Sequence, residues 1–257
     1  MKLPENRFKR ALAARESQIG LWSSLASHTS VELLAGAGFD WLLLDMEHAP
    51  NELPMVHGQL QAMAGSKTHP IVRPPWNEMV TIKRLLDIGA QTLLIPYVET
   101  EAQAKEAVAF TRYPPEGVRG YASGARASGY GRVADYAKTC ASELCVLVQV
   151  ESRLGLENLE RIAAVDGIDG VFIGPGDLAA ALGHVGEPGH PEVQAVIEDT
   201  IRRIVATGKP AGILTPNETF ARRYIELGCL FTAVGSDIGL LGRGAEQLAA
   251  RFKADRP

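Results

Sequence analysis

Residues 39–50 read FDWLLLDMEHAP, and this stretch is the strongest indication of how the chain folds. It opens on a continuous apolar run, WLLL, which is typical of a strand buried on both faces of a parallel sheet. The run changes without a spacer to Asp45, Glu47 and His48. An α/β scaffold presents its chemistry at the carboxyl ends of such strands, although a strand can also simply end in solvated polar residues.

The same alternation of buried strand and amphipathic helix continues along the chain. Strands are predicted at residues 19–24, 41–44, 69–76, 92–98, 144–150, 170–174, 211–214 and 230–235. Helices are predicted at residues 6–16, 30–36, 52–64, 78–88, 101–111, 155–164, 193–207, 218–227 and from about 244 to 253. Strict alternation implies parallel pairing with right-handed crossovers.

Eight such units in 257 residues favour a closed (β/α)8 TIM barrel over an open doubly wound sheet. No GxGxxG follows an early strand, which further weakens a dinucleotide-binding fold. We therefore expect one α/β domain, residues 1–257, with an extra N-terminal helix and a C-terminal helix.

The amino-acid composition limits which kinds of binding partner and which cellular compartment are plausible. Twenty-six basic and thirty acidic side chains give a formal charge of −4, which argues against nucleic acid or an anionic membrane as the main partner. No apolar run approaches the length of a membrane span, and the N-terminus lacks the apolar core of a signal peptide. The three cysteines form no CxxC motif, so we expect buried free thiols in a cytoplasmic protein.

The carboxyl ends of the predicted strands carry acids, one imidazole and one guanidinium. They carry no lysine. They carry Trp22, Ser23, Asp45, Glu47, His48, Arg73, Glu99, Glu151, Asp177 and Asp237. Imine chemistry needs a desolvated lysine at this rim, so a Schiff-base enzyme is disfavoured.

Glu151 and Asp177 follow adjacent strands and suit a hard divalent ion such as Mg²⁺ or Mn²⁺. Two structural alternatives remain open: Glu151 could pair with Arg153, and Asp177 could cap a helix that begins near Leu178. Around Gly176, free backbone N–H groups at a helix start would suit a small carboxylate or phosphate.

Arg73 lies between an apolar stretch and two prolines. It could hold an oxyanion or carboxylate through its fork of donors, or form a structural ion pair across the barrel mouth. His48 is favoured as a proton carrier over a merely hydrogen-bonded histidine. After the last strand, Asp237 could begin a phosphate cup or a helix, and we favour the helix.

Two segments break the alternation. Residues 113–134 are rich in Gly, Arg and Ser, and so long an irregular segment is usually functional or contacts a partner subunit. Residues 183–191 form a second loop, whose His184 and His190 show no metal-ligand spacing.

Several motifs, in order, resemble those of the HpcH/HpaI family of metal-dependent (class II) pyruvate aldolases. They are LWSS, DWLLLDMEHAP, VRPPW, LLDIGAQTLLIPYVET, GVRG, VQVES, FIGPGDLA and AVGSD, which span nearly the whole chain. The resemblance implies a carbon–carbon lyase that reversibly cleaves 4-hydroxy-2-oxo acids to pyruvate, or hydroxypyruvate, and an aldehyde.

The resemblance also implies roles for individual residues. Glu151 and Asp177 would hold Mg²⁺, Mn²⁺ or Co²⁺, Arg73 would clamp the enolate, and His48 would be the general base oriented by Asp87. The remaining substrate-binding positions would be Trp22, Gln149, Gly176 and Asp177 itself. The family is hexameric, a trimer of dimers, with a segment like residues 117–131 reaching a neighbour's site. On this interpretation Asp45 and Glu47 shape the site or hold metal-bound water.

Two other functions remain open. A citryl-CoA or malyl-CoA lyase of the same superfamily would also use a metal and two acids, but would need a CoA-binding surface. A non-catalytic barrel that serves as a binding or assembly protein predicts neither a metal nor enolisation.

Overall fold

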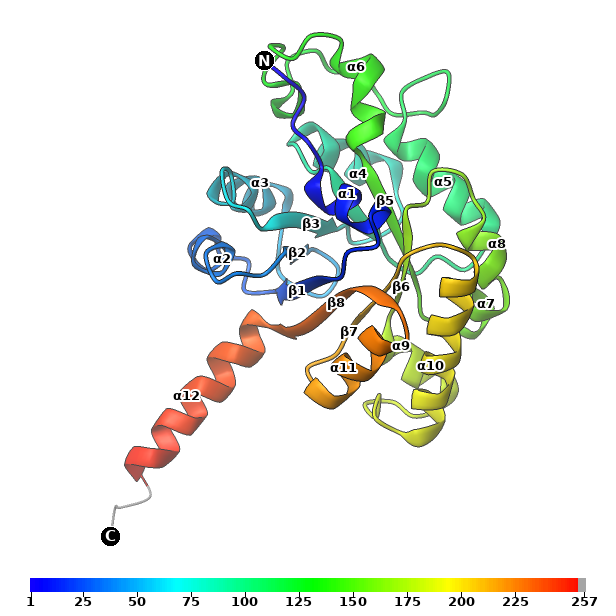
Figure 1. Cartoon of the computed structure of the whole chain (residues 1–257). Helices are drawn as coiled ribbons and strands as arrows, with labels where there is room; N and C mark the ends of the chain where they lie inside the picture. Colours follow the sequence, from blue (N-terminus) through cyan, green and yellow to red (C-terminus); the bar gives the residue numbers. More distant parts are fainter. Residues whose placement is uncertain (254–257) are drawn as a thin grey trace.

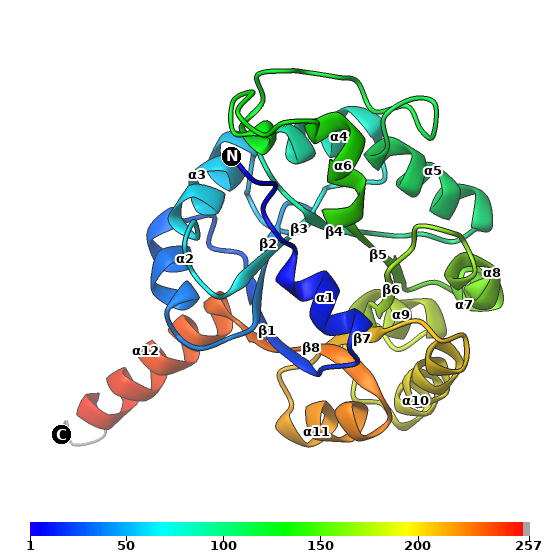
Figure 2. The same cartoon turned by 45° about the horizontal axis from the view of Figure 1, so that its top comes forward.

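The computed structural model describes residues 1–253 and contains a closed barrel of eight parallel strands in chain order. The predicted (β/α)8 TIM barrel is therefore confirmed. Figure 2 shows the helices arranged around the ring of strands. The strands are β1 (Gln18–Ser23), β2 (Trp41–Asp45), β3 (His69–Arg73), β4 (Thr92–Ile95), β5 (Cys145–Val150), β6 (Gly170–Ile173), β7 (Ala211–Leu214) and β8 (Cys229–Ser236).

The helices follow the expected alternation. They are α1 (Arg7–Ala13), α2 (His28–Ala35), α3 (Leu53–Ala62), α4 (Met79–Asp87), α5 (Glu101–Thr111), α6 (Tyr136–Thr139), α7 (Arg153–Glu157), α8 (Leu159–Ala163), α9 (Pro175–Leu182), α10 (Pro191–Ala206), α11 (Glu218–Glu226) and α12 (Asp237–Lys253). Two short 3₁₀ turns, η1 (Arg126–Ser128) and η2 (Cys140–Glu143), lie on either side of α6.

Large aromatic side chains fill the inside of the barrel. Trp41 and Phe231 are at most 1% exposed, and their ring centroids lie 6.5 Å apart. Gly212 makes this packing possible, because a Cβ there would lie 2.2 Å from the Phe231 ring. Helix α1 crosses the amino-terminal opening, where Phe8 packs edge-on against Phe231 with the ring centroids 5.9 Å apart (Figure 2). The barrel therefore has a solid interior, and chemistry is confined to its carboxyl rim.

A second apolar layer lies between the strands and the surrounding helices. Helix α10 shows how it forms, since its apolar side chains recur at helical spacing and are fully buried: Val193, Ile197, Ile201 and Ile204. Burying each such side chain contributes about 1.5–3 kcal/mol. This layer holds the rim loops in place.

Three predicted elements differ from the structure. The helix expected over residues 155–164 is two short helices, α7 and α8, which meet at Asn158. The irregular residues 113–134 include the single turn η1. The last helix begins at Asp237, ahead of the expected residue 244, so the preferred helix start at Asp237 is confirmed over a phosphate cup.

Helix α12 extends away from the barrel (Figure 1). Of its described residues only Asp237 is buried, and its large apolar side chains are exposed: Ile238, Leu240, Leu241, Leu248 and Phe252. The three cysteines are free and buried, as expected. Within residues 1–253 no helix combines the length and the apolarity that a membrane crossing needs.

Candidate active site

A buried ion pair joins the ends of β2 and β3. Asp45 and Arg73 are paired in the strand register, and Asp45 accepts hydrogen bonds from Arg73 Nε at 2.8 Å and Nη2 at 2.7 Å. Trp22 Nε1 donates to the same carboxylate at 3.2 Å, and the guanidinium lies 4.9 Å from the centre of the Trp22 ring. Burial would raise the pKa of Asp45, but the bonds and charge of Arg73 outweigh it and lower that pKa. Asp45 is therefore a fixed anion that orients Arg73.

Glu47 is the second acid beside this guanidinium. Arg73 Nη1 lies 2.8 Å from Glu47 Oε2, so the two groups form an ion pair. The geometry of this pair is not that of a hydrogen bond, and Glu47 Oε2 is buried without a hydrogen-bond partner. Burial, together with the charges of Asp45 and Asp177, raises the pKa of Glu47 to about 7, against the opposing effect of Arg73. Arg73 thus neutralises Asp45 but only partly offsets the negative charge at Glu47.

Glu151 follows β5 and is 2% exposed. Its carboxylate accepts hydrogen bonds from Gln149 Nε2 at 2.5 Å and from the Tyr97 backbone N–H at 3.0 Å. Burial first, and then the charges of Glu47 and Asp177, raise the pKa of Glu151 to about 7 in spite of these bonds. Gln149 Oε1 is buried without a partner.

Helix α9 starts directly above Glu151. Its N-cap is Gly174, where a Cβ would lie 2.2 Å from Glu151 Oε2, so only glycine allows this approach. Asp177 lies in the first turn of the helix, so the alternative in which it caps a helix beginning near Leu178 is wrong. The first N–H groups of a helix have no partner inside it, so those around Gly176 can bind an anion.

Three acids that follow separate strands therefore influence one another's ionisation: Glu47, Glu151 and Asp177. A divalent cation prefers carboxylate oxygens, and it would relieve the repulsion that raises two of these pKa values. The unpartnered Gln149 Oε1 is a further oxygen beside the same spot. The residues present fit a Mg²⁺- or Mn²⁺-type ion. The alternative pairing of Glu151 with Arg153 does not form, since Arg153 Nε donates to the Ala181 carbonyl.

His48 and Asp87 lie at opposite ends of the barrel. The His48 side chain is 63% exposed at the carboxyl rim, with Nε2 3.9 Å from Glu47 Oε2. Helix α4 leads from the carboxyl end of β3 to the amino end of β4, so its last residue, Asp87, is at the amino rim. There Asp87 accepts a hydrogen bond from the fully buried Arg119 at 2.9 Å. Within one chain, Asp87 does not contact His48.

The chain matches the sequence profile of the HpcH/HpaI aldolase/citrate lyase family over residues 18–243. It belongs to this family. Curated relatives include a pyruvate aldolase of Rhizobium etli, 59% identical over 98% of this chain and 99% of the relative, and a hydroxypyruvate/pyruvate aldolase of Pseudomonas aeruginosa, 58% identical over 100% and 96%.

Another relative of the same kind is a 4-hydroxy-2-oxo-heptane-1,7-dioate aldolase of Klebsiella pneumoniae, 60% identical over 96% of this chain and 94% of the relative. Among solved structures, an HpcH/HpaI aldolase/citrate lyase family protein of Burkholderia cenocepacia superposes with a TM-score of 0.93 at 41% identity. That match covers 96% of this chain and 99% of the other. The resemblance inferred from the sequence motifs is thereby confirmed.

For this family member, the structure brings together most of the side chains predicted from the sequence. Trp22, Arg73, Gln149, Glu151 and Asp177 line one region of the carboxyl rim, with Asp45 and Glu47 between them. The sequence did not reveal two contributions to the site. The Tyr97 backbone N–H donates a hydrogen bond to Glu151, and the absence of a side chain at Gly174 lets the Glu151 carboxylate approach α9. A hydrophilic strand end reveals acids, but not which main-chain groups will orient them.

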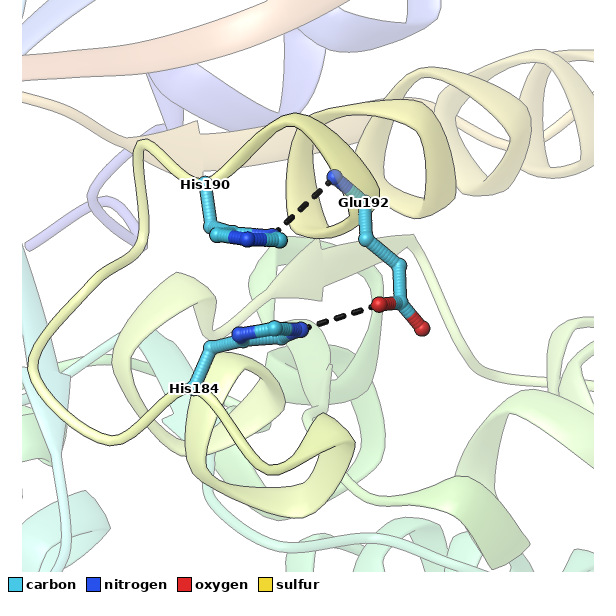
Figure 3. Close-up of side chains that lie close together, drawn as sticks. All are labelled: His184, His190 and Glu192. Atoms are coloured by element: carbon cyan, nitrogen blue, oxygen red, sulfur yellow. Dashed lines mark hydrogen bonds and ion pairs between the residues drawn. The ribbon is translucent and has the colours of Figure 1, made fainter.

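A second cluster of potential ligands lies in the loop between α9 and α10 (Figure 3). The ligand atoms of His184, His190 and Glu192 fall within 4.8 Å of one another. Figure 3 shows the two imidazole rings stacked. Their centroids lie 3.6 Å apart, and the angle between their planes is 17°. Nitrogen lone pairs lie in the ring planes, so nearly parallel rings do not converge on a tetrahedral ion. His184 bonds Glu192 at 2.9 Å, and the Glu192 N–H donates to His190, so this cluster holds the loop onto α10.

Proposed function

We propose that this chain is a divalent-metal-dependent aldolase that cleaves 4-hydroxy-2-oxo acids to pyruvate, or hydroxypyruvate, and an aldehyde. Membership of the family and the aldolase activities of relatives at 58–60% identity support it. The observation that carries it is the set of mutually repelling carboxylates beside an oriented guanidinium, since two of these acids have pKa values raised to about 7. Such a site attracts a cation and a substrate anion together.

Glu151 and Asp177 would hold the ion, which we expect to be Mg²⁺, Mn²⁺ or Co²⁺. When bound, such an ion supplies Lewis-acid polarisation of the 2-oxo group. Gln149 donates to Glu151 and so fixes the orientation of that carboxylate. The backbone N–H groups around Gly176, at the positive end of α9, would bind the carboxylate of the 2-oxo acid.

Arg73 would stabilise the enolate oxygen. A guanidinium has five N–H donors on three nitrogens. The contacts with Asp45 and Glu47 engage one N–H group on each nitrogen, which leaves one further N–H group on Nη1 and one on Nη2 for substrate. Because Asp45 and the Trp22 ring fix the guanidinium before substrate arrives, little reorganisation is needed as charge develops.

His48 would move the methyl proton, directly or through a water. An imidazole can accept and donate a proton, and the exposure of His48 at the rim leaves it free to exchange protons with solvent. Asp87 could orient His48 only from a second copy of the chain, since it lies at the other rim of its own barrel. The exposed apolar side chains of α12 support assembly, and the family resemblance suggests a hexamer.

We further propose a cytoplasmic location, supported by the three buried free cysteines. The activity is tested by supplying a 4-hydroxy-2-oxo acid and measuring the pyruvate released. We expect release to require Mg²⁺ or Mn²⁺ and to stop when EDTA is added. Activity that survives EDTA, or inactivation by borohydride in the presence of substrate, would contradict a metal-dependent mechanism and indicate an imine instead.

A further inference from the structure

Two aromatic side chains stack at the carboxyl rim without being part of the catalytic residues described above. Trp76 follows β3, three residues after Arg73, and Tyr97 follows β4. Their ring centroids lie 5.8 Å apart with an angle of 26° between the planes. Trp76 is 51% exposed and Tyr97 37% exposed, so the pair presents a large apolar face to solvent at the mouth of the site.

The Tyr97 backbone ties this pair to the proposed metal site. Tyr97 has φ +53°, a left-handed conformation that is uncommon for a residue with a side chain. In that conformation its N–H donates to Glu151 Oε1 at 3.0 Å. Strain of this kind is found where the surrounding structure needs it, and here it directs one main-chain donor to the carboxylate while the ring stacks on Trp76.

Glu99 lies two residues after Tyr97, and its negative charge acts on the Tyr97 hydroxyl. Its carboxylate accepts a hydrogen bond from Ser152 Oγ at 2.6 Å. Because Glu99 is not one of the residues that would hold the metal, its charge is not neutralised when the ion binds. A second carboxylate on the aldehyde would therefore meet repulsion from Glu99 on this side of the site.

In the aldol direction, the new carbon–carbon bond forms between the methyl carbon of pyruvate and the aldehyde carbon, and the aldehyde oxygen takes a proton to become the 4-hydroxyl. On the proposed function, the pyruvate part would lie between Glu151, Arg73 and the start of α9, and the barrel interior below is filled by Trp22 and Phe172. The aldehyde must then approach from the open side, where the aromatic pair stands.

We propose that Trp76 and Tyr97 form the acceptor subsite, and that it prefers uncharged aldehydes with a flat apolar substituent over aldehydes that carry a carboxylate. This rests on the proposed aldolase function. An aryl substituent would stack on the exposed rings and remove apolar area from water, whereas a carboxylate would face Glu99.

The test compares kcat/KM for addition of pyruvate to three aldehydes with Mn²⁺ present: benzaldehyde, acetaldehyde, and the four-carbon aldehyde-acid released when 4-hydroxy-2-oxo-heptane-1,7-dioate loses pyruvate. We expect the unsubstituted protein to favour benzaldehyde over the aldehyde-acid. Trp76→Ala should lower the benzaldehyde-to-acetaldehyde ratio about tenfold or more, since losing apolar contact with one substituent is worth about that much discrimination. Trp76→Phe keeps a ring and should restore most of the ratio.

Leu33→Ala is the control, because it also removes an exposed apolar side chain, but from α2. Its acceptor ratio should match that of the unsubstituted protein. An unchanged ratio in Trp76→Ala, or a preference for the aldehyde-acid in the unsubstituted protein, would overturn the proposal. Failure of the aldolase function itself looks different: no aldehyde would then react with pyruvate in any of these proteins.

Discussion

Replacing Glu151 by glutamine should stabilise the metal-free protein at alkaline pH. The folded protein holds the pKa of Glu151 at about 7, above its ordinary value of 4.5. Between these values the folded chain binds more protons than the unfolded chain, so the free energy of unfolding falls as pH rises through this window. Glu151→Gln removes the ionisable group, so the free energy of unfolding should no longer fall on account of this residue as pH rises.

The size of the effect follows from the shift. A displacement from 4.5 to about 7 corresponds to about 3 kcal/mol once the carboxylate is fully ionised. Glu151 is 2% exposed, so solvent screening reduces this little. Part of the shift comes from Glu47 and Asp177, which relax in the variant, so we expect a gain of about 1–3 kcal/mol. For a chain of this length that raises the Tm by about 2 °C or more per kcal/mol.

The substituted amide keeps its partners. Glutamine Oε1 can still accept from the Tyr97 N–H. Gln149 Nε2, which donates to the Glu151 carboxylate, would face the new NH₂ group, so the Gln149 amide must turn over until its unpartnered Oε1 accepts from that group. The gain should therefore not be masked by a lost hydrogen bond.

The assay is thermal unfolding with EDTA at pH 5 and pH 8.5. At pH 5 Glu151 is already protonated, so the two proteins should unfold at similar temperatures. At pH 8.5 the variant should be the more stable, and adding Mn²⁺ should raise the Tm of the unsubstituted protein alone. Equal differences at both pH values, or a less stable variant at pH 8.5, would refute the account of this carboxylate.

Three further substitutions separate roles at the rim. Arg73→Ala leaves Asp45 buried and unpaired, so we expect a loss of about 3–5 kcal/mol in denaturant unfolding as well as lost aldol activity; unchanged stability would contradict the buried pair. His48→Ala should lower pyruvate release about 10²–10⁴-fold in a coupled assay while leaving the Tm unchanged, because the side chain is exposed; normal release would remove His48 from its role. Gly174→Ala forces a Cβ to within 2.2 Å of Glu151 Oε2 and should weaken Mn²⁺ binding measured by calorimetry; an unchanged affinity would show that Glu151 is not a ligand.

The fold was predictable because a parallel barrel repeats one simple signal. Each strand buried on both faces reads as an apolar run, such as WLLL before Asp45, and each helix reads as a 3.6-residue period. The ends of helices and strands were harder to predict where tertiary packing overrides the local secondary-structure propensity. Helix α12 begins at Asp237 because that carboxylate accepts hydrogen bonds from Ser23 and from the Ser24 N–H, contacts between opposite ends of the chain that no local pattern contains.

The candidate site was partly predictable for the same reason. Acids after apolar runs pointed to Glu151 and Asp177, since parallel strands bring their carboxyl ends to one rim. The interpretation of Arg73 as either a substrate clamp or a structural ion pair was too narrow, because the pair with Asp45 is what positions the guanidinium. The left-handed backbone of Tyr97 depends on tertiary contacts and leaves no trace in the residues around it.

Exchange of the methyl protons of pyruvate with deuterium oxide is the most direct test of the central claim, because it needs no aldehyde. With Mn²⁺ and the unsubstituted protein, the methyl signal of pyruvate should disappear from the proton NMR spectrum far faster than in buffer containing Mn²⁺ alone. EDTA should abolish the exchange, and Glu151→Gln should lack it. Exchange no faster than in buffer, or exchange that persists with EDTA, would contradict an enolate formed at this metal site.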